Sequence, residues 1–401
     1  MEGKSLRIYS SEKTFFSKLT NTITKMLIPT KVGINGILIT MKRNSVLKNY
    51  ENYIQGKHLE EEKKKNLEKK YEESYSLYLD SIDKNIVDSV YKKVKNNTAS
   101  EFEKEALSKY YMIVHLKEEE YAEYKYRKQK YLLELDYESV KETNKAKILE
   151  KYKKFYVSKM ESIYKGLLKH YSVKLADNLS FVAKDEIYSK IFNTLEEYIV
   201  NILPLKCEND ETNNCKELLS EYEKFERFTV GKLDQNEMIE KNMILLGISR
   251  KIFTHSLPLV VAEQCYIKLL KDLRSLIVDT RVIKKQERAY ELLIKLIEEF
   301  NLKLLSTKIY WDKQEDKKEY RKFWDKYNKI EELKETNSED YLKQKEILFI
   351  KNDLKCVQKN ENKYFKIIKF YKNKLVELGV MKELYNRCKS TKNYTKQKIV
   401  A

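Results

Sequence analysis

The sequence predicts an all-α protein, a multi-helix bundle of long antiparallel helices that pack in coiled-coil-like hairpins. Only 8 Gly and 3 Pro occur among its 401 residues, so the chain has few residues that favour tight turns or interrupt helices. Hydrophobic residues make up 42% of the chain and charged residues 35%, a mixture that suits amphipathic helices and is too apolar for a chain disordered throughout. A chain of this length is expected to hold two or three domains with a buried core.

Residues 1–57 are expected to form a basic N-terminal arm. No acidic residue occurs between Glu12 and Glu51, while several lysines and one arginine lie between them. The dipeptide Asn35-Gly36 stands between apolar residues, which is the pattern of a two-residue hairpin turn. We therefore expect at most one short β-hairpin, near residues 31–40, with an irregular apolar linker as the alternative.

Residues 58–203 are expected to form a region of long helical hairpins. Its apolar residues recur at helical spacing, as in the series Leu149, Tyr152, Tyr156, Met160 and Ile163. Polar breaks such as Asn96-Asn97-Thr98 would connect antiparallel neighbours. The polar run that follows Pro204 predicts a loop at residues 204–216.

Residues 217–310 are expected to form an apolar helical core, and residues 311–401 are expected to form basic C-terminal helices. One segment of the latter predicts a basic amphipathic helix. Its apolar stripe consists of Tyr364, Ile367, Ile368, Tyr371, Leu375 and Leu378. A second face carries Lys359, Lys363, Lys366 and Lys374.

The positive charge is concentrated at the two ends of the chain. Residues 1–58 and 301–401 carry net charges of +7 and +11, whereas residues 59–180 and 181–300 carry +3 and −3. This distribution favours a polyanionic partner, either nucleic acid or an anionic membrane surface. The alternative is that the lysines only solvate helix surfaces.

The five cysteines give no sign of a disulfide framework. Their number is odd, and the sequence contains no Cys-x-x-Cys pair that would suggest a thiolate zinc site. We therefore expect a reducing, cytoplasmic setting. No stretch approaches the roughly 18 uncharged apolar residues of a membrane span, and the N-terminus lacks the pattern of a signal peptide, so neither a transmembrane segment nor secretion is expected.

The common local signatures of enzymes do not occur in the sequence. The four histidines are far apart, and none stands in a His-Glu-x-x-His or Glu-x-x-His spacing. No Gly-x-x-x-x-Gly-Lys-Ser/Thr, Gly-x-Gly-x-x-Gly or Gly-x-Ser-x-Gly pattern occurs either. We therefore predict no catalytic residues, no metal ligands and no cofactor. Because carboxylates from distant parts of a chain can converge on a metal ion, a metal-dependent enzyme is kept as an alternative.

Two internal segments have patterns that occur in nucleic-acid binding. Residues 242–257 resemble a helix-turn-helix, with Gly247 at the turn and with Arg250 and Lys251 facing a DNA groove. A junction between two core helices would explain Gly247 equally well. In residues 121–131, tyrosines alternate with cationic residues as in a stacking platform, although the same spacing also suits tyrosines that lie along helix seams.

These observations lead to the hypothesis of a non-enzymatic, nucleic-acid-associated binding protein that uses its basic terminal segments. The residues expected to contact the nucleic acid are Lys42, Arg43, Lys48, Arg250, Lys251, Lys363, Lys366, Lys369, Lys372 and Lys374. The alternative is a helical scaffold that binds another protein and has no nucleic-acid role, as in a mobile-element, phage or defence system. The sequence does not predict an oligomeric state.

Overall fold

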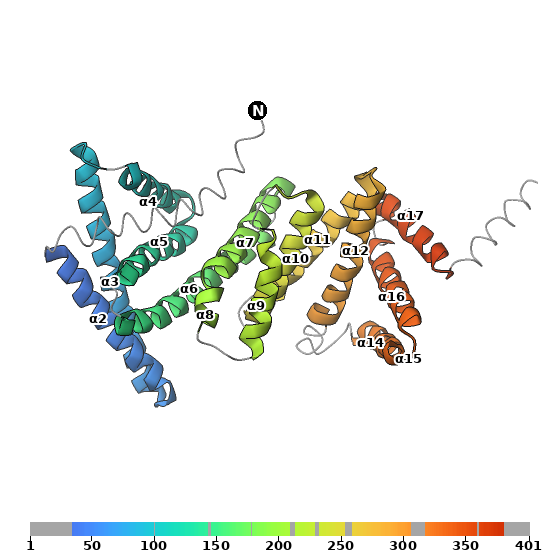
Figure 1. Cartoon of the computed structure of the whole chain (residues 1–401), viewed down its shortest axis with the longest axis horizontal. Helices are drawn as coiled ribbons and strands as arrows, with labels where there is room; N and C mark the ends of the chain where they lie inside the picture. Colours follow the sequence, from blue (N-terminus) through green and yellow to red (C-terminus); the bar gives the residue numbers. More distant parts are fainter. Residues whose placement is uncertain are drawn as a thin grey trace, which may run out of the picture. The chain divides into compact units, whose positions relative to one another are not determined.

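The computed structural model describes residues 34–99, 101–142, 146–177, 179–208, 213–228, 232–252, 259–305, 317–358 and 361–380. Across these ranges the chain forms helices and contains no strand, so the all-α, multi-helix prediction is confirmed (Figure 1). The chain divides into two compact units. Unit 1 comprises residues 1–232 and 247–257, and unit 2 comprises residues 233–246 and 258–401.

Unit 1 is built from helices that pack on their neighbours along the chain. They are α2 (Ile34–Gln55), η1 (Gly56–His58), α3 (Glu61–Lys95), α4 (Glu101–Glu119), α5 (Tyr121–Glu142), α6 (Ala146–Ala176), α7 (Phe181–Asn201), α8 (Leu203–Cys207), α9 (Asn213–Glu226) and the part of α10 (Gln235–Ile252) from Gly247 onward. The blue helices α2 and α3 pack together, joined by the short turn η1 (Figure 1). Because α3 also contacts α5, and α2 also contacts α6, helices that are distant in sequence share one core.

The segment near residues 31–40, where the sequence allowed a β-hairpin, is helical from Ile34 onward, and residues 1–33 lie outside the described ranges. A longer apolar pattern explains the difference. Ile39, Val46 and Leu47 are all buried, and spacings of seven and eight residues place them on one face of a helix. The apolar residues beside Asn35-Gly36 therefore belong to a helix that packs on α3.

The predicted loop at residues 204–216 is also partly helical. The short helix α8 contains Pro204 in its first turn, where the missing N–H of proline costs no hydrogen bond. The next helix, α9, begins at Asn213, and residues 209–212 lie outside the described ranges. These two helices bring the buried Cys207 and Cys215 together, with their Sγ atoms 2.7 Å apart.

The core of unit 1 contains a buried polar network. The guanidinium of Arg43 donates from Nε and Nη2 to the two carboxylate oxygens of Asp136, over 2.8 and 2.5 Å. The hydroxyl of Tyr78 donates to the same carboxylate and lies 2.7 Å from the hydroxyl of Tyr152. All four residues are at least 95% buried, so these contacts replace the water that each polar group loses on folding.

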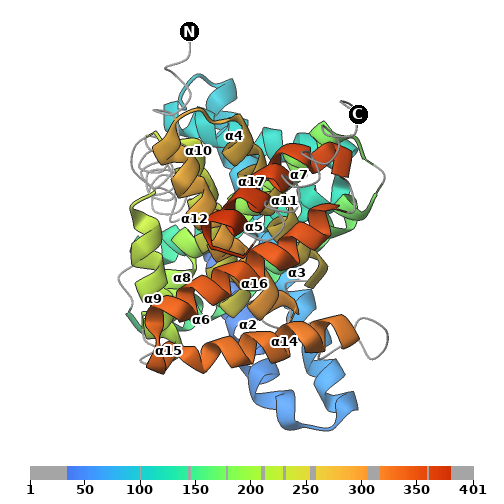
Figure 2. The ribbon, with the colours of Figure 1, turned by 90° about the vertical axis from the view of Figure 1, so that its right-hand side faces the viewer.

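Unit 2 has its own core and a similar network. Its helices are the first part of α10 (Gln235–Ile252), α11 (Leu259–Asp279), α12 (Ile283–Glu299), the π-helical η2 (Phe300–Leu305), α14 (Lys317–Glu331), α15 (Leu333–Thr336), α16 (Ser338–Gln358) and α17 (Glu361–Glu377). The buried Asp353 on α16 accepts hydrogen bonds from Arg274 on α11 and from the Tyr371 hydroxyl on α17. Helices α14 to α17 are orange to red in Figure 2. None of the described helices is long and apolar enough to cross a membrane.

Candidate functional site

A pocket of about 580 Å³ lies among α3, α5 and α6 of unit 1. Its aromatic lining comes from Tyr75 on α3 and from Tyr121, Tyr124 and Tyr126 on α5. We call it the tyrosine pocket. Its volume lies within the range of roughly 300–1,000 Å³ that is typical of small-molecule sites.

The tyrosine-rich segment of residues 121–131 lines this pocket with only part of its side chains. Tyr121, Tyr124, Lys125, Tyr126, Lys128 and Gln129 line the pocket, whereas Glu123 and Arg127 contact α6 and α7 on another side of α5. Glu123 and Arg127 are four residues apart and therefore share a face of α5, which points away from the pocket. The helix-seam interpretation describes Tyr131, which is buried, and the stacking-platform interpretation stays a prediction.

Gly166 on α6 lets Tyr126 come close to that helix. A Cβ atom at this position would lie 2.2 Å from Cε1 of the Tyr126 ring, which is far inside van der Waals contact. Any larger residue would therefore push the ring away from α6 and change the shape of the pocket wall.

Two lysines in the pocket wall are already paired with carboxylates. The Nζ atom of Lys159 lies 2.9 Å from Oε1 of Glu72, and it also lies 4.1 Å from the centre of the Tyr75 ring. Burial lowers the pKa of Lys159 despite this ion pair. The Nζ atom of Lys128 lies 2.6 Å from Oδ2 of Asp83, and 5.7 Å from the centre of the Tyr124 ring.

The hydroxyl of Tyr75 is an unusual feature of the pocket. Tyr75 is only 5% exposed, and its hydroxyl has no hydrogen-bond partner. A buried hydroxyl without a partner costs free energy, and such groups are rare in folded proteins. Less than 1 Å² of this hydroxyl oxygen is accessible, so it is closed off from the space inside the pocket as well.

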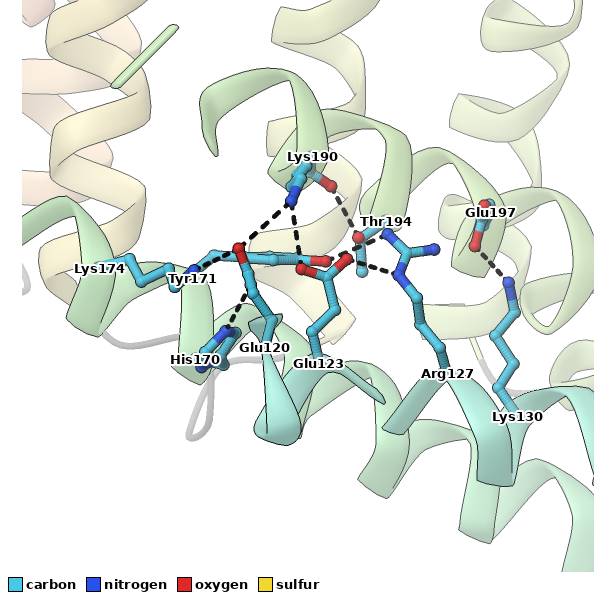
Figure 3. Close-up of polar contacts among 10 residues, drawn as sticks. All are labelled: Glu120, Glu123, Arg127, Lys130, His170, Tyr171, Lys174, Lys190, Thr194 and Glu197. Atoms are coloured by element: carbon cyan, nitrogen blue, oxygen red, sulfur yellow. Dashed lines mark hydrogen bonds and ion pairs between the residues drawn. The ribbon is translucent and has the colours of Figure 1, made fainter. Parts of the chain in front are cut away.

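A second polar site, the α5–α6–α7 cluster, consists of Glu120, Glu123, Arg127, His170, Lys174 and Lys190 (Figure 3). Lys174 binds Oε1 of Glu120 over 2.5 Å, and Nε2 of His170 lies 3.4 Å from Oε2. Arg127 donates to Oε1 of Glu123 over 2.6 Å, and Lys190 donates to Oε2 over 3.2 Å. Burial alone would raise the pKa of Glu123, but Arg127 and Lys190 outweigh it and lower this pKa to about 2.

The cluster has the geometry of a metal site but not the charge of one. Ligand atoms of Glu120, Glu123 and His170 all lie within 4.8 Å of one another. Each of the four carboxylate oxygens, however, already faces Lys174, His170, Arg127 or Lys190. A divalent cation would have to displace these cationic groups, since the arginine and the two lysines outnumber the two carboxylates. We therefore assign the cluster to an ion-pair network that joins α5, α6 and α7.

The residues predicted to bind nucleic acid differ in exposure, and some of them form ion pairs within the chain. Lys48, Lys366, Lys369 and Lys372 are exposed, and Lys42 and Arg250 are partly buried. Lys251 pairs with Glu217 and Glu221, and Lys374 pairs with Glu377. Lys363 lies in α17, but its side chain is outside the described ones.

The burial of Arg43 contradicts the prediction that this residue contacts nucleic acid. Its side chain was expected to contact phosphates from the surface, but Arg43 is 5% exposed and is held by Asp136. A phosphate could reach it only if this buried ion pair broke, which is costly. In the sequence Arg43 is an arginine in a basic segment without acidic residues. Nothing in that segment indicates that it pairs with Asp136 on α5.

The helix-turn-helix interpretation is also corrected. Gly247 lies inside α10, which continues without a turn from Gln235 to Ile252. A Cβ atom at Gly247 would contact nothing within 4 Å, so the glycine is required neither by a turn nor by close packing. Residues 253–257 of the motif lie outside the described ranges.

Comparison of the chain with protein-family models, with curated proteins and with solved structures gave no match.

Proposed function

We propose that this chain is a non-enzymatic, nucleic-acid-associated binding protein that holds its partner through the exposed side of α17. The α17 surface is defined by Phe365, Lys366, Lys369 and Lys372, whose side chains are all exposed. The opposite side of the helix is buried in unit 2 through Ile367, Ile368, Tyr371 and Leu375. This division of α17 into a packed apolar face and an exposed basic face is the observation that carries the proposal.

The packed face of α17 favours nucleic acid over a membrane. An amphipathic helix binds a membrane by inserting its apolar face among the lipids. In α17 this face already packs against α16 and α11, so the side presented to a partner is mainly cationic. Lysines on one side of a helix are suited to a phosphate backbone, and binding of this kind weakens as salt increases.

Phe365 adds an exposed aromatic ring beside the lysines, on which an unpaired base can stack. Its side chain is 63% exposed, which is uncommon for a phenylalanine in a folded unit. Lys369 and Lys372 follow it by four and seven residues, so all three lie on one side of the helix. An aromatic ring beside cationic residues is the arrangement that binds unpaired bases next to a phosphate backbone.

The experiment compares two triple variants of the full chain. Changing Lys366, Lys369 and Lys372 to Gln removes three charges from the α17 surface, and changing Lys65, Lys69 and Lys70 to Gln removes the same charge from an exposed part of α3. Fluorescence anisotropy with labelled single-stranded and double-stranded oligonucleotides should show weaker binding for the first variant and near-normal binding for the second. Equal losses in both triple variants would mean that only net charge matters, and would contradict the proposal.

Phe365→Ala should weaken binding of single strands more than binding of duplexes.

The second candidate function is a helical scaffold that binds another protein. It is favoured by Phe181 and Val182 at the start of α7, which are 60% and 77% exposed, because exposed apolar residues can mark a protein contact. Under this candidate, the α17 triple variant would bind oligonucleotides no differently from the unmodified chain. The coiled-coil-like packing of the long hairpins and the cytoplasmic setting stay predictions.

A further inference from the structure

Cys207 and Cys215 form a pair of buried thiols at the junction of α8 and α9 (Figure 1). Cys207 is the last residue of α8, and Cys215 is the third residue of α9. The pair belongs to unit 1, whereas the α17 surface belongs to unit 2. A role for these thiols therefore does not depend on nucleic-acid binding.

The two sulfur atoms lie closer together than atoms that merely pack. Non-bonded carbon atoms approach to roughly 3.5–4.0 Å, and sulfur is larger than carbon. The Sγ atoms of Cys207 and Cys215 are 2.7 Å apart, although the two residues belong to different helices. Their side chains therefore point at each other, and a disulfide with its bond length of about 2.05 Å needs only a small shift.

A disulfide explains this pair better than a metal site does. A thiolate zinc site needs three or four protein ligands around one point. Among the described residues, no third cysteine, histidine or carboxylate places a ligand atom beside both sulfur atoms. Two thiols alone provide the groups for one covalent bond, and they do not complete a coordination shell.

Helix α8 holds Cys207 on a well-packed part of unit 1. Leu203 at the start of α8 is fully buried, and the helix contacts both α6 and α7. The Nζ atom of Lys206 lies 2.6 Å from Oε1 of Glu161 on α6. The position of Cys207 is therefore fixed by contacts that do not involve α9.

Helix α9 has fewer attachments. Among the described helices it contacts α8 most, and α8 has only five residues. It buries Phe225 near its end, and its Glu217 and Glu221 lie 2.5 and 2.7 Å from Nζ of Lys251. Ion pairs that are partly open to solvent contribute little to stability. A covalent bond at Cys215 would therefore be the strongest attachment of the first turn of α9.

We propose that Cys207 and Cys215 form a reversible disulfide that fastens the start of α9 to α8 in an oxidising thiol–disulfide environment. One protein thiolate attacks a low-molecular-weight disulfide such as oxidised glutathione and releases one reduced glutathione. The second protein thiolate attacks the resulting mixed disulfide and releases the other. The protein loses two electrons and two protons, and one oxidised glutathione becomes two thiols.

Burial determines when this exchange takes place. Cys207 is 5% exposed and Cys215 is 3% exposed, so neither thiol meets an oxidant while α9 is closed on α8. The exchange therefore proceeds when the first turn of α9 opens. Once the bond has formed, it restricts the open state, because a disulfide lowers the conformational entropy of the detached chain.

The first experiment tests whether the bond forms. The full chain is equilibrated in buffers with graded ratios of oxidised to reduced glutathione, quenched with acid, alkylated and mapped by mass spectrometry. We expect peptides joined through Cys207 and Cys215, with one midpoint. Cys356→Ser removes an exposed thiol on α16 and should leave this midpoint unchanged. Free thiols at both positions in the most oxidising buffer, or glutathione adducts in place of the joined peptides, would overturn the proposal.

The second experiment tests whether the bond fastens α9. Hydrogen exchange of the amides of α9 is compared between the oxidised and the reduced protein, and oxidation should slow it by roughly 10- to 100-fold. Cys215→Ala keeps a small apolar side chain but cannot form the bond, so its α9 should exchange at the same rate in both buffers. Equal exchange in the two forms of the unmodified chain, with the disulfide present, would show that the bond does not fasten α9.

Discussion

Arg43 on α2 and Asp136 on α5 are 93 residues apart in the sequence and form a bidentate ion pair in the core of unit 1. Unit 2 repeats the arrangement with Arg274 and Asp353, which are 79 residues apart. In both units a tyrosine hydroxyl donates to the same carboxylate, from Tyr78 or from Tyr371. Each pair therefore ties helices that are distant in sequence into one core.

The first expected outcome concerns the stability of unit 1. Asp136→Ala leaves the Arg43 guanidinium buried without its partner, which should lower the free energy of unfolding by about 3–5 kcal/mol. Urea denaturation followed by circular dichroism measures the loss. Lys48→Ala, on the same helix as Arg43 but exposed, is the control and should change the stability by less than about 0.5 kcal/mol. A loss below about 1 kcal/mol for Asp136→Ala would show that the ion pair does not hold the core together.

A second comparison distinguishes a partnered tyrosine hydroxyl from an unpartnered one. Tyr78→Phe removes the hydrogen bonds to Asp136 and Tyr152, so we expect a loss of about 1.5–3 kcal/mol. Tyr75→Phe removes a hydroxyl that has no partner, so its stability should be unchanged or slightly higher. The same denaturation experiment measures both. Equal losses in the two variants would mean that the Tyr75 hydroxyl is bonded in solution.

The α5–α6–α7 cluster should make stability depend on pH in the acid range. The pKa of Glu123 is about 2 in the folded chain, against an ordinary value of 4.5. A lowered pKa means that the folded state favours the ionised carboxylate, so this stabilisation is present above about pH 4.5 and is lost as the pH falls toward 2. Glu123→Gln should flatten the fall in melting temperature across this range. Glu119→Gln, an exposed neighbour, should leave it unchanged, and a matching slope in both variants would contradict the assignment.

The close approach of Cys207 and Cys215 leads to a redox experiment. Their Sγ atoms are 2.7 Å apart, so a disulfide needs little rearrangement of α8 and α9. On treatment with the oxidant diamide, the two thiols should lose two hydrogens and form an intramolecular disulfide, which peptide mapping by mass spectrometry detects. Cys265, whose pKa burial raises to about 12, should stay reduced. Recovery of Cys207 and Cys215 as free thiols after oxidation would show that they are not positioned to react.

The sequence was sufficient to predict the fold class, but not to predict which polar residues are buried in the cores. Composition and apolar spacing predict helices, and the stripe of Ile367, Ile368, Tyr371 and Leu375 is indeed the buried face of α17. Arg43 was misassigned because its burial depends on Asp136, a partner that no local pattern indicates. For Gly247 the sequence left a turn and a junction between two helices open, and it lies inside α10, because a glycine inside a helix has the same local signature as a glycine at a turn.

The tyrosine pocket and the thiol pair were not predicted at all. The pocket requires α3, α5 and α6 to meet, and their contributing residues are spread from Glu72 to Ile163. The only local signal was the tyrosine-rich segment of residues 121–131, where chance pairing of Tyr and Lys is also frequent. Cys207 and Cys215 are eight residues apart, a spacing that matches no common disulfide or metal motif.

The central claim, that the lysines of the α17 surface bind phosphates, is tested most directly by the salt dependence of duplex binding. The slope of log affinity against log salt concentration falls by about 0.9 for each phosphate contact that is lost. Replacing Lys366, Lys369 and Lys372 by Gln should therefore reduce the steepness of this slope by about 2–3, while replacing Lys65, Lys69 and Lys70 should leave it unchanged. If the slope of the α17 variant equals that of the unmodified chain, these lysines do not contact the phosphate backbone.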